Sequence, residues 1–330
     1  MIRAAVVGLG WWGELLTELL LTSDVMQPVL GIDPSADSRA RIAERGIEVS
    51  SDFQTALDRD DIDALILCSP HRFHSSQILA AASAGKHVFC EKPFGITSAD
   101  AEVALDAMEA AGLQVGIGHE RRFEPAVLEM QHRLKSGDLG IPLVFEGNFS
   151  QDKFLALPPD NWRLSATEAP VGPLSATGIH LVDLAISLLG APVEVFARLS
   201  TQATTFANGD TLSVTLVFEH GRTAVINAIL TTPFIGRICL IGSEGWMEIR
   251  DRSHPENSTG WDVTTVHRGS DPETRFFPPH RAVLDNLESF AKAISGGEPY
   301  PVSRQEISAN VKAFEAITRS AFTGEIVSIQ

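Results

Sequence analysis

A glycine-rich turn near the start of the chain has the spacing of a phosphate-binding loop. Ile2 to Val7 is an apolar, strand-like run, and Trp12 to Leu21 repeats apolar residues at helical spacing. The GxGxxG motif between them consists of Gly8, Leu9, Gly10, Trp11, Trp12 and Gly13. In this context the glycines permit a tight turn, close approach of a pyrophosphate and packing of helix on strand. The helix N-terminus would bind the phosphates, so the motif predicts a dinucleotide site.

A carboxylate follows at the position from which it can select the dinucleotide. Asp33 ends a second strand-like run, Met26 to Ile32, and lies 20 residues after the last glycine of the motif. There it would accept hydrogen bonds from the adenosine ribose hydroxyls and would repel a 2′-phosphate. Pro34 and Ser35 follow it, and the next arginine is Arg39. We therefore expect NAD as the cofactor, with NADP less favoured.

A third segment, from Ala84 to Pro93, reads AGKHVFCEKP. Together with the glycine turn and a later GxH segment, it resembles the Gfo/Idh/MocA oxidoreductase family, and the resemblance covers nearly the whole chain. The family's EKP lysine reaches the reacting carbon at the nicotinamide, which implies a catalytic role for Lys92 and a cofactor-side position for Glu91. An ammonium there can donate to the substrate oxygen and stabilise a developing alkoxide.

The sequence SPHRFH is similar to the family's TPNxxH region and runs from Ser69 to His74. The resemblance implies that Pro70 and His74 lie along the nicotinamide side of the cofactor, in a segment that also holds Ser69 and His71. His71 stands where the family usually has asparagine. The HxxH spacing also occurs in metal sites, but no further ligands converge on it in the sequence, so we expect no metal.

Two arginines lie in further segments that resemble the family. Asn161–Arg163 is similar to a WR element, and Arg163 would bind cofactor or substrate, or else form an ion pair within its own domain. The segment His119–Pro125 is similar to an RRF-x-P element between the domains. There Arg122 and His119 would border the substrate cleft, or the segment would be a purely structural hinge.

The GxH segment predicts the proton-transfer residue. Many family members carry DxGxHxxD at this position, which implies that His180 transfers the proton and that Asp183 orients or supports it. Ala176 replaces the first aspartate, so the substrate of sugar- or inositol-specific members does not carry over directly. On an α-helix Thr177 would share a face with His180 and present a hydroxyl to the substrate.

These residues predict reversible hydride transfer between NAD and a secondary alcohol or ketone of a sugar, polyol or related polyhydroxy compound. Lys92 would polarise the oxygen and His180 would accept or relay the proton. Two alternatives stay open. One is a redox-neutral sugar modification with recycled cofactor, and the other is a non-catalytic NAD-binding sensor. The sensor would suit the loss of the aspartate at Ala176, whereas Lys92 and His180 argue against it.

The N-terminal third alternates apolar runs with helical patterns, which is typical of a doubly wound parallel sheet, the Rossmann form of the α/β class. The expected strands are 2–7, 26–32, 64–68, 87–90 and 114–117, and the expected helices are 12–21, 35–44, 75–84 and 98–111. Ser35 is a candidate N-cap. The boundary is expected near 118–120, with a dinucleotide-binding domain at 1–120 and a substrate-binding and oligomerisation domain at 121–330.

The second domain is expected to be α+β, with a large open, mostly antiparallel sheet. The expected strands are 143–149, 193–199, 212–218, 223–230, 237–241 and 246–249, and the expected helices are 125–135, 174–189, 281–294 and 304–322. Residues 251–273 are polar and rich in turn formers, which predicts a loop. An open sheet with one apolar face needs cover, and relatives commonly pair through it, so we expect a homodimer or homotetramer.

Composition limits the remaining possibilities. The formal net charge is −16, which disfavours nucleic acid and anionic membranes as partners. Cys68, Cys90 and Cys239 form neither a disulfide framework nor a CxxC metal motif. The N-terminus does not read as a signal peptide, and no apolar run is long enough to cross a bilayer, so a cytoplasmic location is expected.

Overall fold

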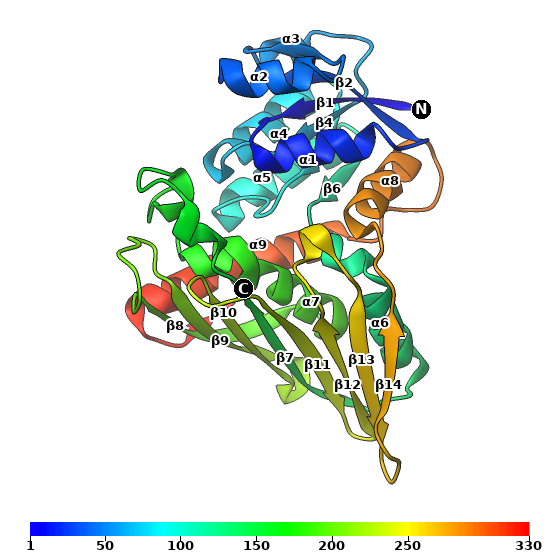
Figure 1. Cartoon of the computed structure of the whole chain (residues 1–330), viewed down its shortest axis with the longest axis vertical. Coiled ribbons are helices and arrows are strands. Elements are labelled where there is room, and N and C mark those ends of the chain that lie inside the picture. Colours follow the sequence, from blue (N-terminus) through cyan, green and yellow to red (C-terminus); the bar gives the residue numbers. More distant parts are fainter. Residues whose placement is uncertain (330) are drawn as a thin grey trace. The chain divides into compact units, whose positions relative to one another are not determined.

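The computed structural model describes residues 1–329, which form two compact units, each with its own sheet (Figure 1). Unit 1 comprises Met1–Glu120 and Ala282–Ser308, and unit 2 comprises Arg121–Arg281 and the chain from Ala309 onward. Residues 1–329 contain a parallel sheet of six strands and a mixed sheet of nine. The predicted fold class is confirmed.

The sheet of unit 1 has the strand order β3-β2-β1-β4-β5-β6 and is parallel throughout. This is the order of the doubly wound dinucleotide fold, in which ligands bind beyond the carboxyl ends of the strands where the order reverses. The strands are β1 Ile2–Val7, β2 Met26–Ile32, β3 Glu48–Ser50, β4 Ala64–Leu67, β5 His87–Cys90 and β6 Val115–Ile117. The helices between them are α1 Trp11–Leu20, α2 Ala36–Ala43, α3 Gln54–Leu57, α4 His74–Ser83 and α5 Ser98–Ala110.

Residues 282–308 are part of unit 1, whereas the domain boundary expected from the sequence, between residues 120 and 121, assigns them to the second domain. Phe290 of α8 (Ala282–Ile294) packs edge-on against Phe89, with ring centroids 5.8 Å apart. Gly116 of β6 leaves room for both rings, because a Cβ there would lie 2.7 Å from Phe89 and 2.9 Å from Phe290. The hydroxyl of Tyr300 accepts the Ile117 N–H at 3.1 Å, which satisfies a donor on the edge strand β6.

The sheet of unit 2 has the strand order β14-β13-β12-β11-β7-β10-β9-β8-β15, and among residues 121–329 only β7 and β10 pair in parallel. Its strands are β7 Pro142–Ser150, β8 Pro192–Ser200, β9 Thr211–Phe218, β10 Thr223–Ile229, β11 Ile235–Gly242, β12 Gly245–Asp251, β13 Trp261–His267, β14 Glu273–Phe277 and β15 Val327–Ser328. Residues of α6 (Pro125–Ser136), α7 (Ile179–Leu189) and α9 (Arg304–Thr323) share one buried cluster with one face of this sheet.

The loop predicted at 251–273 is wrong in part, because β13 and the start of β14 lie within it. Trp261 and Val263 are buried, whereas Asp262 and Thr264 point to the other face. This alternation is obscured in the sequence by the polar outward residues and by the turn formers that follow. The strand β14 is exposed along most of its length, and its charged side chains suit an edge strand.

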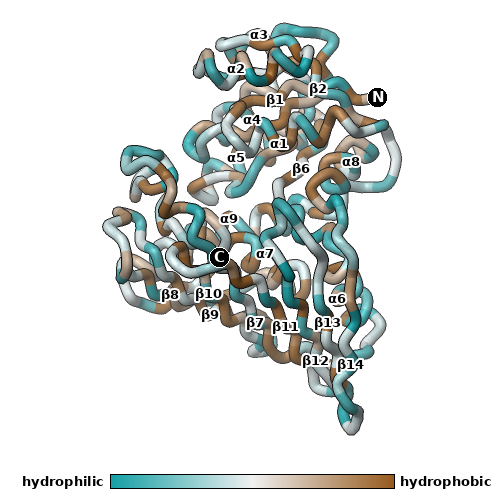
Figure 2. The backbone as a smooth tube through the Cα atoms, in the orientation of Figure 1, coloured by the Kyte–Doolittle hydropathy of each residue, from teal (hydrophilic) through white to brown (hydrophobic). Residues whose placement is uncertain are grey.

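Hydrophobic residues concentrate on the strands, whereas α2 is largely hydrophilic (Figure 2). Its N-cap is as predicted, since the Ser35 hydroxyl accepts the Ser38 N–H. Among residues 1–329, every helix is too short or too polar to cross a membrane.

Candidate functional site

The glycine turn between β1 and α1 is shaped by close backbone contacts. Gly8 has φ +91°, and a Cβ there would lie 2.7 Å from the Cys68 carbonyl and from the Ser69 nitrogen. A Cβ at Gly13 would lie 1.9 Å from the Gly8 oxygen, so neither position accepts another residue. A Cβ at Gly10 would meet no atom within 4 Å, which leaves open space at the N-terminus of α1. These residues fit a dinucleotide pyrophosphate.

Asp33 is held in place at the carboxyl end of β2. Its Oδ2 accepts the Leu9 N–H at 2.7 Å, and its Oδ1 accepts the Ser35 N–H at 2.8 Å. Each oxygen retains a second acceptor site for a ribose hydroxyl. The Arg39 guanidinium donates to the Asp33 carbonyl at 2.7 Å and to the Pro34 carbonyl at 2.9 Å. An arginine therefore contacts the backbone of the residue that carries the carboxylate, although five residues lie between them in the sequence.

His74 joins the turn that follows β4 to the turn that follows β5. Its ring is completely buried, with Nδ1 2.8 Å from the Pro93 carbonyl and Nε2 2.9 Å from the Ser69 carbonyl. Burial lowers the pKa of His74, and the two carbonyl contacts oppose that shift. His71 lies beside it, with ring centroids 5.9 Å apart. Among residues 1–329, no three His, Cys, Asp or Glu side chains gather as metal ligands.

Lys92 follows β5, at the edge where parallel sheets bind ligands. Its backbone N–H donates to the buried carboxylate of Glu91 at 3.2 Å. Gly118 makes room for that carboxylate, because a Cβ there would lie 2.5 Å from the Glu91 side chain. Burial raises the pKa of Glu91, and the Lys92 charge and the Trp12 indole oppose this. The two EKP residues and the glycine-turn helix thus meet at one edge of unit 1.

His180 lies in unit 2, on the first turn of α7, and is 5% exposed. A π-helical turn, η5 (Leu174–Gly178), precedes it, whereas the sequence pattern predicts a continuous α-helix. Within this segment the Thr177 hydroxyl is buried and donates to the Pro173 carbonyl at 3.3 Å. Val171, just before it, has φ +54°, a strained value for a β-branched residue that is often found near functional sites.

Arg122 and Asp183, both expected near the substrate, form an ion pair with each other. Arg122 Nε lies 2.7 Å from Asp183 Oδ2, and Nη2 lies 2.7 Å from Oδ1. Both side chains are buried. Because Asp183 is three residues after His180, the pair fixes the rotation of α7 and hence the direction of the histidine.

Arg163 lies in a short 3-10 helix, η4 (Trp162–Leu164), with its guanidinium 4.4 Å from the centre of the Trp162 ring. Among residues 1–329 no carboxylate pairs with it, and burial lowers its pKa to about 10. This arrangement favours a ligand contact over an internal ion pair. The sequence patterns do not single out Asn208, whose side-chain amide donates to the Arg163 carbonyl at 2.7 Å and to the Ala169 carbonyl at 2.8 Å. The Asn-Gly pair at 208–209 signals only a turn.

Two further clusters in unit 2 join residues that are distant in the sequence. The first contains Phe149, Phe234 and His254 and lies beside His180, since the Phe149 and His180 ring centroids are 5.9 Å apart. The second is a buried group of charges. Arg121 Nη2 lies 2.9 Å from both Asp251 oxygens, and Arg121 Nε lies 3.2 Å from Glu124 Oε1. No short motif in the sequence marks either cluster.

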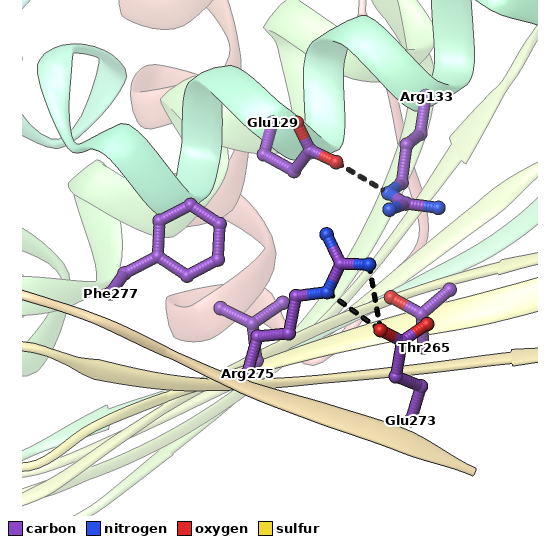
Figure 3. Close-up of a pocket in the computed structure, with 7 residues that line it drawn as sticks. Glu129, Arg133, Thr265, Glu273, Arg275 and Phe277 are labelled. Carbon is purple, nitrogen blue, oxygen red and sulfur yellow. Dashed lines mark hydrogen bonds and ion pairs between the residues drawn. The ribbon is translucent and has the colours of Figure 1, made fainter.

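A pocket between α6 and the β13–β14 hairpin contains none of the predicted site residues (Figure 3). Its lining residues are Glu129, Arg133, Val263, Thr265, Glu273, Arg275 and Phe277. Arg133 pairs with Glu129 at 2.7 Å, and Arg275 pairs with Glu273 at 2.7 Å. The charges of this pocket therefore balance locally.

The glycine turn and Asp33 on a doubly wound sheet define a dinucleotide-binding enzyme. Residues 2–119 match the model described as oxidoreductase family, NAD-binding Rossmann fold, and residues 127–248 match the GFO/IDH/MocA C-terminal domain. The chain belongs to the Gfo/Idh/MocA family and is an NAD(P)-dependent oxidoreductase that acts on CH–OH groups, as predicted.

Three relatives illustrate the similarity. The chain is 28% identical to scyllo-inositol 2-dehydrogenase (NAD(+)) of Bacillus subtilis, with 99% of this chain and 96% of that one covered. It is 28% identical to D-xylose 1-dehydrogenase (NADP(+)) 2 of Haloferax volcanii, with 84% and 83% covered. The solved structure of aldose-aldose oxidoreductase from Caulobacter crescentus, complexed with glycerol, is 26% identical and matches with a TM-score of 0.87 over 99% of each chain.

Proposed function

We propose that the protein catalyses reversible hydride transfer between NAD and a secondary alcohol or ketone of a sugar, polyol or related polyhydroxy compound. The observation that carries this proposal is the presence of both proton-handling groups, Lys92 at the carboxyl end of β5 and His180 on the first turn of α7. The named substrates of the relatives, an inositol and a pentose among them, support the polyhydroxy class.

Each part of the chain has a defined task in this proposal. The residues from Gly8 to Gly13 bind the pyrophosphate, and Asp33 binds the adenosine ribose. When bound, the nicotinamide supplies the hydride acceptor or donor. Lys92 donates to the substrate oxygen and stabilises negative charge on it. His180 accepts the hydroxyl proton during oxidation and returns it during reduction.

We assign the remaining predicted residues to positioning or to cofactor contact. Glu91 and the Arg122–Asp183 pair act through their neighbours, because their contacts hold Lys92 and α7 in place. Arg163 is assigned to the cofactor, since its cation lacks a carboxylate partner within residues 1–329. Ser69, Pro70, His71 and His74 shape the turns on the nicotinamide side, with Trp11 and Trp12 at the start of α1.

We further propose that NAD is preferred over NADP. Both oxygens of Asp33 already accept a backbone N–H and keep their orientation toward the ribose position. The Arg39 guanidinium is engaged with two backbone carbonyls, which leaves the carboxylate as the dominant charge. Relatives named for NAD(+) and for NADP(+) both occur, so the proposed preference rests on the residues around Asp33 and not on the family.

A second candidate is the redox-neutral reaction, in which oxidation and reduction alternate on a retained cofactor. The observation that favours it is the similarity to an aldose-aldose oxidoreductase over 99% of each chain. Stoichiometric release of NADH with a single substrate would contradict this second candidate and support the first.

The test is a screen of sugars, inositols and their keto forms, read by NADH absorbance, followed by single substitutions. Lys92→Met and His180→Ala should each lose about 100- to 10,000-fold in kcat/KM, because a positioned proton-transfer group is removed. Both should bind NAD within a few-fold of the unmodified protein. Thr177→Val is the comparison variant and should do less, mainly raising KM. Near-normal turnover in both Lys92→Met and His180→Ala would refute the assignment.

The assembly that we propose is a homodimer or homotetramer formed through the outer face of the mixed sheet. This face is opposite the one that α6, α7 and α9 cover. Phe196 and Val225 are 40% and 41% exposed on it. The partly exposed apolar side chains around them are Val144, Val217, Ile241 and Trp246. In the strand register Thr215 lies between Phe196 and Val225, and Glu146 lies on the other side of Val225. Large apolar side chains exposed on one face of a sheet are nevertheless typical of an association site.

A further inference from the structure

One asparagine holds both ends of the segment that begins at Arg163. Asn208 lies in the loop between β8 and β9 and is 1% exposed. Its side-chain amide donates to the Arg163 carbonyl at 2.7 Å and to the Ala169 carbonyl at 2.8 Å. Its own carbonyl accepts the Gly172 N–H at 2.7 Å. The two ends of segment 163–172 are therefore tied to the same residue.

The contacts of the Asn208 amide fix its orientation. Nδ2 faces two carbonyl oxygens, so a rotated amide would place Oδ1 against two acceptors. Oδ1 itself is buried and has no hydrogen-bond partner among residues 1–329. Gly172 makes room for this arrangement, because a Cβ there would lie 2.9 Å from the Asn208 amide. The arrangement therefore needs an amide at position 208 and a glycine at position 172.

The loop that carries Asn208 is organised around a buried carboxylate. Asp210 is completely buried, and its side chain accepts the backbone N–H groups of residues 202–204 at 2.8–3.0 Å. These hydrogen bonds lie within the loop and do not involve segment 163–172. Asn208 is therefore held by its own loop and can serve as an anchor for that segment.

The far end of the segment leads into the helix that carries His180. Val171 has φ +54°, and its carbonyl accepts the first two N–H groups of the π-helical turn η5 at 2.9 and 3.0 Å. A strained residue of this kind persists only where its surroundings determine the backbone around it. The contacts of Asn208 on either side of Val171 supply that constraint.

We propose that Asn208 is a positioning residue that holds Arg163 at a fixed place relative to His180. It acts through the backbone, because the Arg163 carbonyl and the start of the His180 helix are tied to one side chain and its own carbonyl. The Arg163 cation is partly exposed and has no carboxylate partner within residues 1–329. This inference rests on the proposed function, in which Arg163 contacts the cofactor, and names the residue on which that contact depends.

The test is a double-mutant cycle on NAD binding, measured by calorimetry in the absence of substrate. Arg163→Gln removes the cation and should raise the NAD Kd by about 10-fold. Asn208→Ala removes both amide donors and should raise the Kd by about 3- to 10-fold, because Arg163 is then less well placed. In the double variant the Kd should equal that of Arg163→Gln within about twofold. A residue with a merely structural role would give effects that multiply.

A second variant reaches the same contact from the other side. Gly172→Ala adds a methyl group that displaces the Asn208 amide, and it should raise the NAD Kd by about 3-fold or more. The matched control is Asn257→Ala, which makes the same change as Asn208→Ala at an exposed position in another loop of unit 2. It should leave the Kd unchanged. Urea unfolding confirms that each variant is folded.

The outcomes separate this inference from the proposed function. An unchanged Kd in both Asn208→Ala and Gly172→Ala, or multiplying effects in the cycle, would overturn the inference alone. An unchanged Kd in Arg163→Gln would overturn it together with the assignment of Arg163 to the cofactor, while Lys92 and His180 are tested by turnover. Absence of NAD binding by the unmodified protein would overturn both the inference and the proposed function.

Discussion

At the scale of single residues, Asp33 carries the choice of cofactor. Its two oxygens are oriented by the Leu9 and Ser35 N–H groups, so removing the carboxylate removes a positioned acceptor pair and a negative charge together. Asp33→Ala should weaken NAD binding by about 10-fold or more, as expected for charge-assisted hydrogen bonds. It should also narrow the difference in affinity between NAD and NADP, because the negative charge that repels a 2′-phosphate is then absent.

Tryptophan fluorescence can report this binding, since Trp11 is 50% exposed next to Gly10. Titrations with NAD and NADP should be made on the unmodified protein, on Asp33→Ala and on Asp37→Ala. The last variant removes the same charge from an exposed position of α2 and should behave as the unmodified protein. Equal or tighter binding of NADP by the unmodified protein would contradict the proposed preference for NAD.

The sequence predicts single site residues well where a local backbone requirement or a motif marks them. Gly8 and Gly13 are required by contacts within a few residues of the turn or with its neighbouring strand, and the motif records both. The ion pair of Asp183 is not marked by a motif, because its partner Arg122 is 61 residues away in the sequence. Only the fold brings such a pair together, so neither its formation nor the burial of both charges is visible in the pattern.

At the scale of elements, a buried group of charges ties the start of α6 to the end of β12. Arg121 is shared between Glu124 and Asp251, so one cation faces two buried carboxylates. Burial raises the pKa of Glu124 to about 7, with Asp251 adding to the rise while Arg121 and Trp261 oppose it. The folded protein therefore holds a proton here more tightly than the unfolded chain does.

The sign of the resulting pH dependence follows from that raised pKa. The stabilising effect of the bound proton is complete below the ordinary glutamate pKa and is lost as the pH rises toward about 7. The free energy of unfolding should fall by up to about 3 kcal/mol across this window. Glu124→Gln, which cannot titrate, should show a smaller fall when urea unfolding is compared between about pH 4 and about pH 8. Parallel curves for the two proteins would contradict the assignment.

Element prediction succeeds where one pattern dominates and fails where two compete. The bounds of β1, β2 and β5 agree with the predicted runs because these strands are apolar throughout or nearly so. The outward residues of β13 are polar and its hairpin partner β14 is exposed. Polar and turn-forming residues therefore dominate this part of the sequence, and the alternation of buried and exposed residues in β13 is not recognised as a strand. The π-helical turn before α7 is equally hidden, because its side chains also fit an α-helix.

At the scale of the whole molecule, the outer face of the mixed sheet determines the expected assembly. Phe196 of β8 and Val225 of β10 are exposed there, whereas Arg237 pairs with Glu146 at 3.0 Å and with Glu248 at 2.6 Å across β7, β11 and β12. The face thus combines an apolar area with a ladder of paired charges. An interface core of apolar side chains with a polar surround has the same composition.

Light scattering coupled to size exclusion measures this assembly directly. The unmodified protein should elute with a mass that is a multiple of 35.6 kDa and independent of dilution over a wide range. Val225→Glu should lower that mass, because burying an unpaired charge in an apolar interface is strongly unfavourable. Val103→Glu makes the same change on the exposed surface of α5 and should leave the mass unchanged. A mass of 35.6 kDa for the unmodified protein at every concentration would show a monomer and contradict the proposed assembly through the apolar face.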